Sequence, residues 1–257
     1  MEKKIINQLK KIEQEHQVKI LYAIESGSRA WGFASQDSDY DVRFIYVHQK
    51  DWYLSIEPKR DVIEMPLEGD LDINGWDLTK ALGLFRKSNP PLYEWLQSPI
   101  VYRKPHSSVS NLGKLVPDFF SPKTCLMHYL SMADNNYKDY MTKPEIKMKK
   151  YFYVLRPIFA CDWIRKFNSM PPIEFDKLRA EQKINKELHQ TVEVLLANKK
   201  QGLEKDLKPR IKIIDDFVQE KLEALKLFAA KMEMSEDLPY EPLNRLFRKT
   251  LSDDPAV

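Results

Sequence analysis

Cysteines, glycines and long apolar runs are all scarce in this sequence of 257 residues. The two cysteines, Cys125 and Cys161, are too few for a disulfide framework or a zinc site, and they fit half-buried thiols. No stretch approaches the ~18 consecutive apolar residues of a membrane-spanning helix. Residues 1–19 have the spacing of an amphipathic helix and lack the continuous apolar segment of a signal peptide. We therefore expect a cytoplasmic protein without a membrane span.

The seven glycines are unevenly distributed, which predicts two structurally different parts. Five of them precede residue 84, where short apolar runs rich in Val, Ile, Phe and Tyr indicate strands. Beyond residue 106 nearly all of the sequence has the spacing of helices. The pattern therefore predicts an α/β or α+β part at residues 1–106 and an all-helical domain at residues 107–257.

The net charge of the chain is +3, and the positive charge belongs to the predicted helical domain. Residues 107–257 contain 26 basic and 22 acidic residues, whereas residues 1–106 contain 15 and 16. This balance is compatible with nucleic-acid contact but does not by itself indicate it.

A loop rich in small residues, GSRAWG, follows the first predicted strand at residues 27–32. Gly27 can adopt backbone angles that other residues avoid, and it lets a ligand approach the main chain. Ser28 adds a hydroxyl group, and a helix starting there would direct its N–H groups at a phosphate. Arg29 lies beside them and fits either a phosphate or a carboxylate partner. A plain turn between a strand and a helix is the alternative for the loop.

Aspartates alternate where the next predicted strand begins. Because side chains on a strand alternate between its faces, Asp39 and Asp41 project from the same face. Two adjacent carboxylates repel unless a cation lies between them, and Mg²⁺ prefers such oxygen ligands. Arg43 shares this face and fits an internal counter-charge. A solvated strand end is the alternative.

The Gly27-Ser28 pair, followed by Asp39-Tyr40-Asp41 on a strand, resembles the motif of the DNA polymerase β-like nucleotidyltransferase superfamily. A wider set of motifs is similar to the predicted nucleotidyltransferases of the RNA-ligase-associated (RlaP, YcgL-like) family. These motifs are GSRAWGF, SDYDVRFIYV, GWDLTKAL, KSNPPLYEWLQSPIVY and YFYVLRPIFACDWI. The resemblance extends from about residue 20 to residue 170 and less clearly to the end.

The superfamily resemblance implies a third carboxylate on a neighbouring strand. The candidates are Asp70, Asp72 and Asp77. We select Asp72 because it lies within strand-like sequence. Asp77 is better placed to cap the following helix, and Asp70 belongs to a turn after Gly69.

The resemblance implies an α+β fold, with a mixed-sheet nucleotidyltransferase catalytic domain at residues 1–106 and a helical domain at residues 107–257 that closes over the substrate and nucleotide. It implies a metal-dependent nucleotidyltransferase, which moves a nucleoside monophosphate from an NTP such as ATP to an acceptor hydroxyl and releases pyrophosphate. Asp39, Asp41 and Asp72 would hold Mg²⁺, with Mn²⁺ as an alternative, and the loop would bind phosphates. The association with RNA ligases favours an RNA acceptor, whereas protein and small-molecule acceptors and the oligomeric state stay open. The alternative is a non-catalytic NTP-binding or toxin-neutralising interaction module with the same fold.

A basic helix face in the predicted helical domain is the remaining candidate site. Lys150, Tyr153 and Arg156 recur at a spacing of three residues and lie along one side of a helix. The superfamily resemblance implies that such a face binds the triphosphate, and an RNA backbone would suit it too. A solvated basic face is the alternative. The five histidines lack the spacing of metal ligands, so we expect no catalytic histidine.

Overall fold

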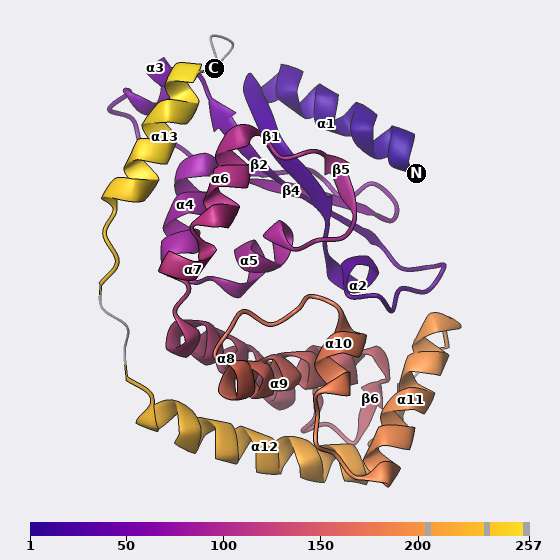
Figure 1. The fold of residues 1–257 in the computed structure, drawn as a ribbon. Helices are drawn as coiled ribbons and strands as arrows, with labels where there is room; N and C mark the ends of the chain where they lie inside the picture. The colour runs from indigo at the N-terminus through magenta and orange to yellow at the C-terminus, as the bar shows by residue number, and fades with distance from the viewer. Residues whose placement is uncertain (204–206, 234–236, 254–257) are drawn as a thin grey trace. The chain divides into compact units, whose positions relative to one another are not determined.

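The computed structural model describes residues 1–203, 207–233 and 237–253, and its contacts divide the chain into two units. Unit 1 contains Met1–Ala30, Asp39–Phe120 and Glu236–Val257, and unit 2 contains Trp31–Ser38 and Ser121–Ser235. Both units contain helices, and unit 1 contains the large sheet, which confirms the predicted α+β class (Figure 1). This division differs from the predicted boundary after residue 106. A segment at residues 31–38 joins unit 2, and the last helix returns to unit 1.

Unit 1 is built around a five-stranded mixed sheet with the strand order β3-β4-β2-β1-β5. Strands β2 and β4 pair in parallel, whereas the other neighbouring strands pair antiparallel. The strands are β1 (Val18–Glu25), β2 (Tyr40–His48), β3 (Val62–Glu64), β4 (Leu71–Asp77) and β5 (Val101–Arg103).

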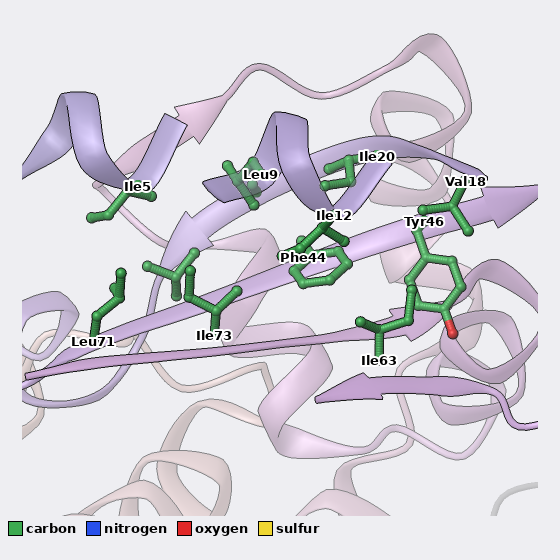
Figure 2. Close-up of a cluster of buried hydrophobic side chains, with 12 residues drawn as sticks. Ile5, Leu9, Ile12, Val18, Ile20, Phe44, Tyr46, Ile63, Leu71 and Ile73 are labelled. Atoms are coloured by element: carbon green, nitrogen blue, oxygen red, sulfur yellow. The ribbon is translucent and has the colours of Figure 1, made fainter. Parts of the chain in front are cut away.

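Helix α1 (Glu2–His16) covers one face of this sheet. Its buried residues Ile5, Leu9 and Ile12 recur at helical spacing and pack in one cluster with Phe44 and Tyr46 of β2 (Figure 2). Helix α4 (Leu78–Arg86) contacts β2 and β4, and Figure 1 shows it on the other side of the sheet from α1. Helices therefore cover both faces of the central strand, β2. This packing holds the polar residues at the start of β2 in place.

The other helices of unit 1 are short, apart from the C-terminal one. Helix α6 lies beside both β1 and α13, and α13 also contacts α4. These contacts explain why the last helix belongs to the sheet unit rather than to the helical one. The helices are α2 (Gly27–Ala30), α3 (Lys50–Tyr53), α5 (Pro90–Leu96), α6 (Ser107–Lys114), α7 (Val116–Phe119) and α13 (Glu241–Asp253).

Asp77 ends β4 and caps α4, as predicted. Its carboxylate accepts a hydrogen bond from the Thr79 backbone N–H at 2.8 Å. The Tyr53 hydroxyl donates to the other carboxylate oxygen at 2.6 Å. Asp77 is fully buried, and its carboxylate serves a structural role as the cap of α4.

Unit 2 is mainly helical, but it also contains a short antiparallel sheet formed by β6 (Glu145–Lys147) and β7 (Leu207–Pro209). The prediction of an all-helical second part was wrong on this point, because strands of three residues carry no readable periodicity. Its helices are α8 (Pro122–Tyr140), α9 (Lys149–Phe167), α10 (Phe175–Ala180), α11 (Lys186–Lys200) and α12 (Lys212–Lys231). In the described part of the chain, no helix is both long enough and apolar enough to span a membrane.

The unfolding free energy should depend on pH through His48. Burial, followed by the charge of Lys59, lowers the pKa of His48 from 6.5 to about 4, and its ring stacks on Trp52 at 3.9 Å between centroids. The unfolded chain therefore binds a proton more readily, and stability is lost as pH falls from about 6.5 towards 4. His48→Phe keeps an aromatic ring but cannot titrate. Denaturant titrations of both proteins across this window should show a smaller loss in the variant, and parallel curves would contradict the assignment.

Candidate active site

Two of the three predicted carboxylates lie side by side on the sheet. Asp41 of β2 and Asp72 of β4 are direct register partners on neighbouring parallel strands, so their side chains share one face. One Arg43 guanidinium nitrogen lies 3.1 Å from an Asp41 carboxylate oxygen and 2.8 Å from an Asp72 oxygen. The structure thus brings Asp72 to Asp41, and it confirms Arg43 as their internal counter-charge.

The glycine of the loop is packed against the Asp41 carboxylate. Gly27 has φ +58°, and a Cβ atom added there would lie 2.0 Å from Asp41 Oδ2. The preceding residue, Ser26, donates its backbone N–H to the Asp41 carbonyl at 2.8 Å. Only a residue without a side chain fits, and the loop with Ser28 therefore begins directly beside this carboxylate.

Glu25, at the end of β1, bonds to the backbone at the start of the neighbouring strand β2. It is fully buried, accepts a hydrogen bond from the Asp41 backbone N–H at 2.8 Å and accepts another from the Tyr102 hydroxyl at 2.5 Å. Burial raises the pKa of Glu25, while the hydrogen bonds from Tyr102 and Asp41 lower it. Glu25 was not among the predicted site residues, although it is an acid that directly ends the apolar run VKILYAI.

The electrostatics of the site fit a bound cation. Burial raises the pKa of Asp41 most, Arg43 lowers it, and the negative charges of Asp72 and Asp39 raise it. The carboxylate oxygens are hard ligands of the kind that Mg²⁺ takes. Among the described residues, no group of three acidic, histidine or cysteine side chains is already arranged around a common point. Asp41 and Asp72 are the residues that could supply oxygen ligands to a divalent cation here, and Arg43 is the positive charge already beside them.

Asp39 directly precedes β2, and Arg29 of α2 contacts the chain at this point. Asp39 is exposed, and its carbonyl accepts a hydrogen bond from Arg29 Nε at 3.2 Å. The Arg29 guanidinium also lies over the Tyr40 ring, 3.7 Å from its centroid. These contacts tie the short helix α2 to the start of β2.

The predicted basic face of α9 is not an open cationic surface. Arg156 is only 3% exposed, its guanidinium carbon lies 4.5 Å from the centre of the Trp31 ring, and it donates to the Ile173 carbonyl at 3.4 Å. Lys150 lies over the rings of Tyr140 and Tyr153, at 4.1 and 4.6 Å. The alternative of a solvated face is wrong for Arg156, because its side chain is buried against the Trp31 ring and bonds to the Ile173 carbonyl.

The segment at residues 31–38 is held within unit 2 by aromatic and hydrogen-bond contacts. The Trp31 carbonyl accepts from the Phe175 backbone N–H at 3.0 Å, and Phe33 packs 4.9 Å from Phe152 between ring centroids. At its end, Lys199 Nζ lies 3.3 Å from Ser38 Oγ. The chain between the loop helix α2 and Asp39 is therefore anchored to the helical unit.

In the nucleotidyl transfer that the motif resemblance implies, Gly27→Ala should lower both the transfer rate and the NTP affinity. Transfer should fall about 10²-fold, because displacing a group at the reacting centre by about 1 Å has effects of that size. Gly32→Ala is the matched control: Gly32 has φ +87° and nothing within 4 Å of an added Cβ atom. It shares the backbone strain but has no clash with Asp41. Transfer rates and calorimetric NTP titrations of both variants test this, and equal losses would show that backbone strain alone is responsible.

The chain matches known proteins along nearly all of its length. The model of the RlaP family, described as the RNA repair pathway DNA polymerase beta family, matches residues 1–249. The uncharacterized protein YcgL of Bacillus subtilis (strain 168) is 50% identical over 253 residues, which cover 98% of this chain and 97% of YcgL.

A crystal structure of a nucleotidyltransferase-like protein from Exiguobacterium sibiricum 255-15 aligns with 98% of this chain and 81% of that one. Its identity is 9% and its TM-score is 0.34, which is too low for an argument about shared function. The family match and the YcgL relationship confirm the resemblance seen in the motifs. The chain belongs to the RlaP family, the RNA repair pathway DNA polymerase beta family.

Proposed function

We propose that this protein is a nucleotidyltransferase that moves a nucleoside monophosphate from an NTP to an acceptor hydroxyl. The observation that carries the proposal is the convergence of three elements: the Asp41 and Asp72 carboxylates in register, and Gly27 packed against Asp41. A solvated strand end would not require a residue without a side chain at this point. The family description, a polymerase beta family, supports the same reaction class.

In this proposal Asp39, Asp41 and Asp72 hold Mg²⁺ or Mn²⁺. Divalent cations in such sites neutralise charge on the transferred phosphate and activate the attacking oxygen. Arg43 keeps Asp41 and Asp72 together and limits their repulsion. Glu25 fixes the main chain of Asp41, so that its carboxylate points at the same place in every turnover.

The proposed reaction is one displacement at the α-phosphorus of the NTP. The acceptor oxygen forms a bond to that phosphorus, and the bond between it and the oxygen bridging to the β-phosphate breaks. Pyrophosphate leaves with the electron pair, and the acceptor proton passes to Asp72 as the general base. The hydroxyl of Ser28 and the main chain at Gly27 contact the phosphates that leave.

The acceptor that we propose is an RNA end. The RNA repair description of the family supports this class over a protein or metabolite hydroxyl. A screen with each α-labelled NTP against RNA, protein and metabolite mixtures tests it. Incorporation of label into RNA is the expected result, and incorporation only into protein or a metabolite would replace RNA as the acceptor.

One observation favours a second candidate, an NTP-binding module without turnover. Arg43 donates to both Asp41 and Asp72, so the chain itself supplies a positive charge that offsets part of their repulsion. Such a module would bind NTP and release no pyrophosphate with any acceptor class. The two candidates therefore differ in turnover and not in affinity.

A further inference from the structure

A groove with a volume of about 360 Å³ lies between α6 and α13 in unit 1. Its lining residues come from two segments far apart in the sequence, around residues 106–115 and 242–250. None of them belongs to the candidate active site. The groove is joined to the sheet at His106, whose backbone N–H donates to the Leu21 carbonyl of β1 at 2.8 Å. Helix α6 is thereby fixed to the strand that ends at Glu25.

The charge of this groove is entirely positive. Lys114 from α6 and Arg245 and Lys249 from α13 line it, and none of its eleven lining residues within the described ranges is acidic. The whole chain carries almost as many acidic residues (38) as basic ones (41), so an unselected lining of this size would include about one or two carboxylates. Arg245 and Lys249 are four residues apart, so they lie on one face of α13 and place their charges on the same side of the groove.

The remaining lining residues suit a sugar–phosphate backbone. Ser107 and Asn111 of α6 provide hydrogen-bonding groups, while the half-buried Leu115 and Leu246 provide an apolar floor. Phe, Tyr and Trp are absent from the described lining, and the one ring in it, that of His106, accepts a hydrogen bond from the Ser108 backbone N–H at the start of α6. The cations and hydroxyl groups of the lining contact phosphates and sugars and are indifferent to base sequence.

We propose that the groove between α6 and α13 binds backbone phosphates of the RNA acceptor. This inference rests on the proposed function, because it concerns how the RNA acceptor of that reaction is bound. A positively charged groove whose apolar residues lie at its base favours binding of a nucleic-acid backbone. A protein that binds a membrane surface inserts protruding apolar residues instead. Leu115 and Leu246 are only half exposed. The groove holds the RNA strand on unit 1, so that its end is presented to the same unit that carries Asp41.

The sharpest test compares two neighbouring arginines of α13. Arg245 lines the groove, whereas Arg248 is paired with Glu241 at 2.5 Å and lies outside the lining. Arg245→Ala and Arg248→Ala remove the same charge from the same helix, so their difference isolates the groove. The probe is a labelled single-stranded RNA of about 20 nucleotides, bound to the full-length chain in EDTA and followed by fluorescence anisotropy at two salt concentrations.

Arg245→Ala should weaken RNA binding about 5- to 10-fold at low salt and reduce the salt dependence by about 0.7 in the log–log slope, as expected for one lost phosphate contact. Arg248→Ala should change affinity less than about twofold. The double variant Arg245→Ala/Lys249→Ala should reduce the slope of log affinity against log salt concentration about twice as much as Arg245→Ala alone. Equal effects of the two single variants would overturn the proposal, because the groove would then have no special role.

Two further measurements separate this inference from the proposed reaction. Asp41→Asn should bind the RNA probe as tightly as the unmodified chain, so groove binding can be established even if no transfer is found. Unlabelled ATP at millimolar concentration should not displace the probe. Displacement by ATP, or equally tight binding of a phosphopeptide, would assign the groove to another phosphate source and contradict an RNA site.

Discussion

Asp41→Asn should abolish nucleotidyl transfer, lowering turnover by on the order of 10³-fold or more, because it removes a charged oxygen where the transferred phosphate must be stabilised. The fold should survive this change. Burial and the neighbouring Asp72 and Asp39 charges raise the pKa of Asp41, so a neutral isostere relieves repulsion while losing the Arg43 ion pair. We expect a stability change within about 1 kcal/mol. Label transfer and thermal unfolding of the purified variant measure the two effects.

Asp70→Asn is the matched control for this variant. Asp70 is an exposed acid two residues before Asp72, and only its backbone carbonyl contacts β2, accepting from Tyr40 at 2.7 Å. It should keep transfer within about twofold, whereas Asp72→Asn should behave like Asp41→Asn. Near-normal turnover of Asp41→Asn, or an equal loss in Asp70→Asn, would show that the wrong carboxylates have been chosen.

Arg156→Ala should destabilise the protein by about 2–4 kcal/mol, the range for large buried side chains whose removal leaves a cavity. The substitution removes a guanidinium that packs on Trp31 and bonds to the Ile173 carbonyl. It should therefore loosen the segment at residues 31–38 within unit 2. Denaturant unfolding gives the free-energy change directly, and Lys166→Ala on the exposed part of the same helix should cost less than about 0.5 kcal/mol.

The same variant decides between the two roles of Arg156. As a buried structural residue it should leave NTP affinity unchanged wherever the chain is still folded. If it contacts the triphosphate instead, affinity should fall by about 10- to 150-fold for all four NTPs, the loss of a hydrogen bond to a charged group. Lost affinity with unchanged stability would contradict the structural role.

The parts of the fold that local pattern determines were predictable. The runs VKILYAI and YDVRFIYV correspond to β1 and β2, because apolar, β-branched segments of that length fit a sheet buried on both faces. The division into units was not predictable. An amphipathic helix such as α13 shows that it has a partner, but its sequence does not say which surface that partner is. The segment at residues 31–38 joins unit 2 through contacts to residues about 120 to 160 positions away.

The candidate site shows the same limit at the level of single residues. Alternation placed Asp41 and Arg43 on one face, and the structure bears this out with their ion pair. Glu25 was missed because its burial and its hydrogen bonds to Asp41 and Tyr102 arise only when β1, β2 and β5 are assembled in one sheet. Arg156 was read as part of a basic face because spacing along a helix does not reveal what covers it.

Turnover distinguishes the transferase from a binding module, and the stoichiometry of pyrophosphate release measures it directly. The chain is incubated with α-labelled NTP, Mg²⁺ and RNA, and pyrophosphate and incorporated label are counted in the same reaction. We expect one pyrophosphate for each label transferred to RNA, and neither product in EDTA or with Asp41→Asn. Saturable NTP binding without pyrophosphate release, with every NTP and with RNA, protein and metabolite acceptors, would contradict this expectation and identify a binding module instead.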